Sequence, residues 1–188
     1  NVVASIPSGD TRAVVELNLE SGAVSGPMFH HPDYDLDGFG YDPRTARATD
    51  IRYTDDFQRV IPFDAKERAF QQGLEKAIPG AAPIVVSRSD DGGRAVIRAV
   101  YADKPAAFLL YTAATGKISK ISSSYRSLDG KNLLRRVKYD YGASDGTKVP
   151  GYLTIPAGRE AKNLPLVVLP HGGPEARDDM SFDWWSGF

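Results

Sequence analysis

The sequence contains no cysteine among its 188 residues. This absence excludes disulfide bonds, thiolate zinc sites and a cysteine nucleophile. It does not distinguish a cytoplasmic protein from an exported one, because both kinds can lack cysteine. The compartment therefore stays open between cytoplasm and periplasm.

An excess of charge of one sign is also missing. The chain has 23 Lys and Arg against 24 Asp and Glu, a net charge of −1, and the two signs are interspersed. A surface that binds nucleic acid needs clustered basic residues that displace counterions from phosphates. We therefore expect no nucleic-acid partner.

Long apolar runs are absent as well. The run Leu166–Leu169 is closed by Pro165 and Pro170, whereas a membrane helix needs about 20 apolar residues. We expect no membrane span and no membrane partner.

The chain starts at Asn1 without an initiator Met or a leader, and it stops in an aromatic stretch over residues 182–188. We expect it to be a piece of a longer protein.

Residues 1 to 126 carry a pattern of short strands separated by turn residues, which is typical of an all-β sandwich, barrel or propeller. We expect one strand from Ala13 to Leu19, and two hairpins around Asp42–Thr45 and Asp90–Gly93. Two strand-turn units that end in glycine, at residues 15–22 and 109–116, echo each other as propeller blades do. This half is predicted to hold two blades.

A helical insertion is predicted near residues 64–78. Asp64 and Glu67 form an N-terminal capping pair, and Pro79-Gly80 ends the run. Phe70, Leu74 and Ile78 recur at helical spacing, which indicates one apolar face. We interpret this helix as packing against a blade edge.

The pattern changes after Tyr125, and we place a domain boundary near residue 127. Strands are expected over residues 136–141, 149–155 and 164–169. The last is apolar at consecutive positions, as in a strand covered on both faces by helices. The fold class is therefore mixed, with all-β residues 1–126 followed by the start of an α/β sheet in residues 127–188.

The segment Leu164–Pro174 joins that predicted buried strand to a loop with two glycines, Gly172 and Gly173. Glycine lets main-chain N–H groups approach a ligand with no Cβ in the way. In α/β-hydrolases the loop after the third strand donates one oxyanion-hole N–H. The alternative is an ordinary strand-to-helix turn.

The run Gly151-Tyr152-Leu153-Thr154-Ile155-Pro156, the apolar segment after it, His171 to Pro174, and Arg177-Asp178 resemble the entry to the hydrolase domain of the prolyl oligopeptidase family, in its acylaminoacyl-peptidase-like bacterial branch. The resemblance implies the last blades of a β-propeller in residues 1–126 and the first strands of an α/β-hydrolase domain in 127–188. It implies a serine peptidase whose Ser, Asp and His follow residue 188. This chain alone is then expected to be inactive.

The same resemblance gives the site residues. Gly172 and Gly173 are expected to form the oxyanion loop, and Gly173 is the favoured donor. His171, Pro174, Arg177 and Asp178 are expected to support that loop. His171 is not expected to be the general base, because the triad histidine of this fold follows the nucleophile.

Two further patterns imitate functional motifs. Gly142-Ala143-Ser144-Asp145-Gly146 matches G-x-S-x-G, but a nucleophile elbow leads into a helix, and Asp145-Gly146 is typical of a hairpin turn. The run His30–Gly38 resembles the start of a calcium loop, yet Arg44 stands where that loop needs a bidentate Glu. We expect neither a nucleophile at Ser144 nor a metal site, and no cofactor.

Two functions compete with the peptidase hypothesis. One is an esterase or other acyl hydrolase, because one fold accommodates several acyl groups. The other is a non-enzymatic propeller used for binding. The expected partners are a peptide substrate and the remainder of the chain's own hydrolase domain, and the oligomeric state is open.

Overall fold

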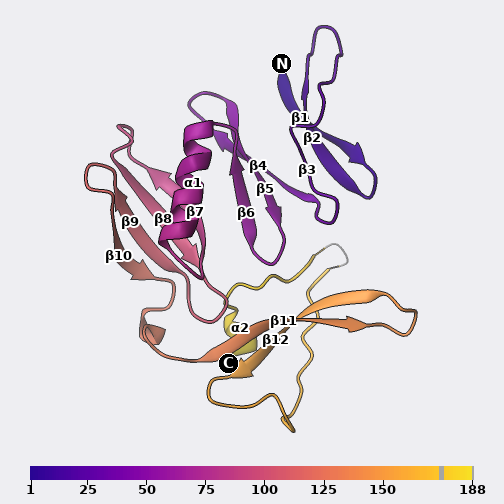
Figure 1. Ribbon diagram of the computed structural model, residues 1–188, viewed down its shortest axis with the longest axis vertical. Helices are drawn as coiled ribbons and strands as arrows, with labels where there is room; N and C mark the ends of the chain where they lie inside the picture. Colours follow the sequence, from indigo (N-terminus) through magenta and orange to yellow (C-terminus); the bar gives the residue numbers. More distant parts are fainter. Residues whose placement is uncertain (174–175, 188) are drawn as a thin grey trace. The chain divides into compact units, whose positions relative to one another are not determined.

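A computed structural model of the chain describes residues 1–173 and 176–187. Its strands form four small antiparallel sheets, and helices are few (Figure 1). The chain divides into two compact units, Asn1–Gly73 and Leu74–Phe188. No helix in the described part of the chain is long and apolar enough to cross a membrane.

The first unit begins with a three-stranded sheet of β1 (Val2–Ser8), β2 (Thr11–Leu17) and β3 (Phe29–His30), in that order. Gly9 has a φ of +66° in the turn from β1 to β2. Val14 and Val15 of β2 are fully buried on opposite faces. The predicted strand from Ala13 is therefore confirmed, although it ends at Leu17.

The second sheet of this unit contains β4 (Leu36–Asp42), β5 (Arg47–Thr54) and β6 (Gln58–Pro62). The predicted hairpin is confirmed: Asp42 Oδ1 accepts a hydrogen bond of 2.9 Å from Arg44 N in the β4–β5 turn. The ring of Tyr53 lies 5.4 Å from that of Phe29. A tilted ring pair therefore connects the two sheets of the first unit.

The predicted helix is confirmed as α1 (Ala65–Ala77). Asp64 Oδ1 accepts hydrogen bonds from the N–H groups of Lys66 and Glu67, at 2.8 and 3.0 Å, as an N-cap residue does. Leu74 and Ile78 are buried as the spacing indicates, and Gln71 is buried with them.

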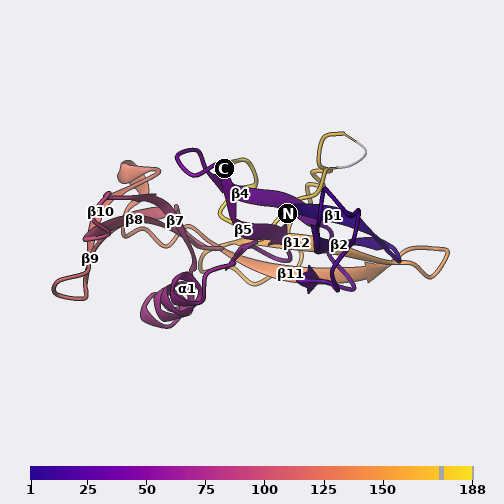
Figure 2. The ribbon, with the colours of Figure 1, turned by 90° about the horizontal axis from the view of Figure 1, so that it is seen from above.

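The second unit contains a four-stranded sheet of β7 (Ala82–Arg88), β8 (Arg94–Val100), β9 (Ala107–Thr112) and β10 (Lys117–Ser123). The strands are neighbours in chain order and all antiparallel, and Figure 2 shows them side by side. Ile97 and Ala99 at its centre are fully buried. The β7–β8 hairpin predicted around Asp90–Gly93 is confirmed.

A single 3₁₀ turn, η1 (Arg126–Leu128), leads to the hairpin of β11 (Leu134–Gly142) and β12 (Lys148–Pro156), and the short helix α2 (Trp184–Gly187) follows. The two predicted strands of this hairpin are confirmed. The predicted boundary near residue 127 falls inside the second unit and stays a prediction.

The predicted strand over Leu164–Leu169 is not found. These residues have no regular secondary structure, and Leu166, Val167 and Val168 are about three-quarters exposed. An apolar strand of this kind needs a paired strand on at least one side and a covering layer. No strand of the described residues pairs with it, so the α/β character of this region stays a prediction.

Candidate functional site

The predicted oxyanion loop lies between β12 and α2. Gly172 and Gly173 are both exposed. An added Cβ at either glycine would meet no atom within 4 Å, but Gly173 has a φ of +76°. That left-handed conformation favours glycine at position 173 even though space is available.

The other predicted site residues are only partly brought together. Arg177 donates from Nε to the main-chain oxygen of Asp178 at 3.4 Å, and both residues are exposed. His171 is exposed too, and no hydrogen bond joins it to another residue of the described ranges. Pro174 lies outside the described residues.

The near end of this loop is fixed at the base of the β11–β12 hairpin. Ala157 N donates to the carbonyl oxygen of Leu133 at 3.1 Å. Leu134 and Ile155, which flank this bond on the two strands, are buried. The chain therefore enters the loop from a well-packed position.

The far end is fixed by Arg136, for which the sequence predicted only a place at the start of a strand. Its side chain is 9% exposed. Nη1 donates to the carbonyl oxygen of Ser181 at 3.0 Å and to Ser186 Oγ at 3.3 Å, and the guanidinium lies 5.6 Å from the Tyr152 ring centroid. Nε is buried without a partner among the described residues.

Further contacts hold the same segment. Thr154 Oγ1 on β12 lies 3.2 Å from Ser186 Oγ. Phe182 N donates to the carbonyl oxygen of Tyr101 at 2.7 Å, and its ring lies 6.2 Å from that of Tyr125. Residues 181–186 thus contact both the hairpin and the end of the β7–β10 sheet.

Asp183 is the N-cap of α2. Its carboxylate accepts hydrogen bonds of 3.0 Å from the N–H groups of Trp185 and Ser186. Burial acts to raise the pKa of Asp183, but the Ser186 and Trp185 N–H groups and the positive charge of Arg136 outweigh it, and the pKa lies below its usual value. The carboxylate is therefore ionised at neutral pH.

A hollow of about 510 Å³ lies beside the base of the hairpin. Its lining includes Asp103, Arg135, Arg136 and Arg159, and no serine or histidine of the described residues lines it. It therefore has no nucleophile and base of the kind that acyl transfer requires.

Ser144 is in a hairpin turn. Ala143 N donates to Thr147 O at 2.8 Å, Gly146 N donates to Ala143 O at 2.9 Å, and Gly146 has a φ of +87°. The turn joins β11 to β12, at the end of the hairpin far from α2 in Figure 1. The interpretation of Asp145-Gly146 as hairpin residues is confirmed, and Ser144 does not lead into a helix.

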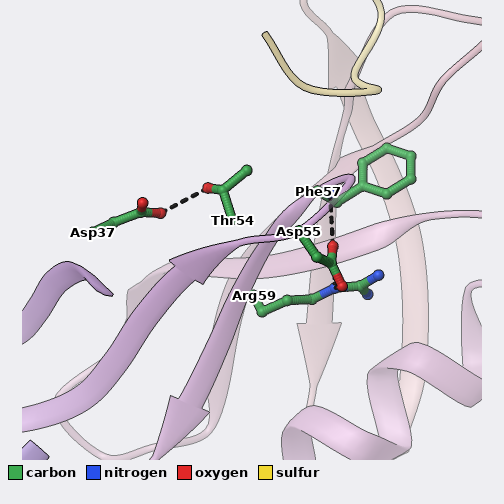
Figure 3. Close-up of polar contacts among 5 residues, drawn as sticks. All are labelled: Asp37, Thr54, Asp55, Phe57 and Arg59. Atoms are coloured by element: carbon green, nitrogen blue, oxygen red, sulfur yellow. Dashed lines mark hydrogen bonds and ion pairs between the residues drawn. The ribbon is translucent and has the colours of Figure 1, made fainter. Parts of the chain in front are cut away.

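The acidic run after His31 is used in separate contacts. Asp35 Oδ1 accepts from Arg12 N and Leu36 N, while Asp37 Oδ2 accepts from Thr54 Oγ1 at 2.7 Å (Figure 3). Among the described residues no three His, Cys, Asp or Glu side chains gather in a way that could hold a metal ion.

Figure 3 also shows an ion pair in the β5–β6 turn that was not predicted from the sequence. Asp55 accepts from Phe57 N and from Arg59 Nε, both at 2.9 Å. Burial acts to raise the pKa of Asp55, but the Phe57 N–H and the Arg59 guanidinium lower it by more, so the pKa lies below its usual value. The spacing Asp-x-Phe-x-Arg is the pattern that could have predicted this ion pair. The contacts indicate that the pair fixes the turn.

Comparison with known proteins gives one match. No family model matches the chain, and no solved structure matches it. The chain is similar to dipeptidyl aminopeptidase BIII of Pseudoxanthomonas mexicana, with 30% identity over 182 residues. The match covers 92% of this chain and 26% of that protein, so the chain spans about a quarter of its relative. This similarity supports a relationship to peptidases.

Proposed function

We propose that this chain is part of a serine peptidase of the prolyl oligopeptidase family. The observation that carries the proposal is the similarity to an aminopeptidase along 92% of the chain. It agrees with the resemblance of residues 151–178 to the entry of that family's hydrolase domain. The similarity is therefore not confined to the loop, because it also includes the sheets that precede it.

The two halves of the chain have different roles in this proposal. The sheets formed by β1 to β10 are the last blades of a β-propeller, and the four-stranded meander β7–β10 has the strand number and order of one blade. The hairpin β11–β12 and the segment after it begin the α/β-hydrolase domain. The propeller restricts access to short peptides.

The chemistry is acyl transfer. An activated serine adds to a peptide carbonyl, a histidine takes the serine proton and later gives it to the leaving amine, and an aspartate orients that histidine. All three follow residue 188. This chain supplies the main-chain N–H of Gly173, or of Gly172, to the oxygen that becomes negative when the serine adds.

The exposed apolar run Leu166–Leu169 is consistent with this division of the protein. Four consecutive apolar residues, roughly half to three-quarters exposed, are costly in water. In an α/β-hydrolase the strand before the oxyanion loop is covered by neighbouring strands and helices. The remainder of the hydrolase domain is the partner that would cover this run.

The test is carried out on the full-length protein. Labelling with a fluorophosphonate probe and a panel of peptide and ester substrates should give a labelled serine and higher kcat/KM for the peptides. Higher values for the esters would favour the acyl-hydrolase alternative. A protein that neither labels nor turns over any substrate would overturn the peptidase proposal and favour the binding propeller.

A further inference from the structure

We infer that Arg136 is a positioning residue for the oxyanion loop, holding the end of the loop that follows Gly173. The inference deepens the proposed function and rests on it. Arg136 is far along the chain from the loop, and no family motif quoted above includes it. Its role comes from its burial and its contacts.

The first step is that the buried charge of Arg136 needs partners where it lies. A buried guanidinium is costly unless hydrogen bonds and charges compensate it. Here Nη1 donates to Ser181 O and Ser186 Oγ, and the positive charge of Arg136 lowers the pKa of Asp183. The segment 181–186, together with the Tyr152 ring, therefore compensates the buried charge.

The second step concerns the loop itself. Between Arg159 and Met180 the described residues form neither helix nor strand, so no ladder of main-chain hydrogen bonds fixes their course. The loop is held at Ala157, by its bond to Leu133, and at residues 181–186. Arg136 provides the charged contact at the second of these points.

The third step is the consequence for catalysis. An oxyanion donor stabilises the transition state only if it is held in place before the reaction. A looser far end lets Gly173 N move, which weakens a contact made in the transition state more than contacts made by the bound substrate. Loss of Arg136 should therefore lower kcat and leave KM nearly unchanged.

The chain offers a matched control. Arg135 is the preceding residue of β11, and its side chain is exposed whereas that of Arg136 is buried, since successive side chains of a strand point to opposite faces. Arg135→Met removes the same charge and the same length of side chain without touching residues 181–186. Arg136→Lys keeps the charge but loses the planar fork of donors.

The experiment uses the full-length protein with a dipeptide p-nitroanilide, a fluorophosphonate probe and amide hydrogen exchange. Arg136→Met should lower kcat and the rate of labelling by about 10- to 100-fold, with KM within a few-fold. Arg136→Lys should recover part of the loss, and Arg135→Met should behave as wild type. Exchange at Phe182, whose N–H is bonded to Tyr101, should be faster in the Arg136 variants than in Arg135→Met and wild type.

The outcomes separate the two ideas. A wild-type protein that neither labels nor turns over substrate would overturn the proposed function. An active wild type with the same kcat in Arg136→Met as in Arg135→Met would overturn the positioning role alone.

If Arg136→Met does not fold, the variants Arg136→Lys and Thr154→Val test the positioning role instead. Thr154→Val removes a contact of Ser186 without exposing a charge. Normal kcat and normal Phe182 exchange in both would overturn the inference.

Discussion

Gly173 has a left-handed backbone conformation, with a φ of +76°, and open space around its Cα. A residue with a Cβ is strained there by about 1–2 kcal/mol whatever its size. The strain can be relieved by turning the peptide group, which would turn the Gly173 N–H away from the oxyanion position. Activity should therefore be more sensitive than stability at this position.

Gly173→Ala in the full-length protein should lower kcat by roughly 10²–10³, as the loss of one oxyanion donor does. Steady-state kinetics and thermal unfolding together measure the two effects. The matched control is Gly158→Ala, since Gly158 also has a positive φ, of +73°, but lies at the other end of the loop. A folded Gly173→Ala variant with near-normal kcat would mean that the loop is only a turn.

Ser144 lies in an exposed hairpin turn whose shape depends on Asp145, Gly146 and main-chain bonds. Ser144→Ala in the full-length protein should leave kcat within a few-fold and change the free energy of unfolding by no more than about 0.5 kcal/mol. Fluorophosphonate labelling and denaturant unfolding check both. Loss of covalent labelling would show that this motif holds the nucleophile after all.

At the scale of elements, the short helix α2 depends on its N-cap. Asp183→Ala leaves the N–H groups of Trp185 and Ser186 without their acceptor, and it should lower the free energy of unfolding by about 1 kcal/mol at neutral pH. Asp183→Asn keeps an acceptor oxygen and should lose less. Urea unfolding of the three proteins measures the difference.

The pH dependence of this effect follows from the sign of the pKa shift. The pKa of Asp183 is lower in the folded protein, so its carboxylate stabilises the fold at pH values above the unfolded pKa of about 3.9. That contribution is lost as the pH falls from there through the folded pKa. The stability difference between wild type and Asp183→Ala should shrink in this range. A difference that stayed constant down to pH 2 would contradict the assignment.

The elements predicted best are those whose signals are local. The α1 helix was predicted from Asp64 and the spacing of Leu74 and Ile78, and the β7–β8 hairpin from the glycines and aspartates of its turn. In each case a few adjacent residues determine the backbone conformation. The prediction of a strand over residues 164–169 was wrong because its signal is not local. An apolar run forms a strand only where another strand pairs with it.

At the scale of the whole molecule, the proposed arrangement places the nucleophile outside this chain. The isolated 188-residue chain should therefore not react with a fluorophosphonate probe, whereas the full-length protein should label at one serine. Intact-mass measurement after incubation distinguishes the two. Stoichiometric labelling of the isolated chain would mean that it carries its own nucleophile.

The sequence alone determined the turn chemistry, the capped helix, the succession of short antiparallel strands and the interpretation of Ser144 as a turn residue. It also indicated Gly172 and Gly173 as the oxyanion loop, through the resemblance of the surrounding motifs to the prolyl oligopeptidase family, and that role stays a prediction. Only the tertiary structure revealed that Arg136 is buried against residues 181–186 and that Phe182 contacts Tyr101. Turns and caps depend on neighbours in the chain, whereas the burial of a charged side chain depends on partners 45 or more residues away.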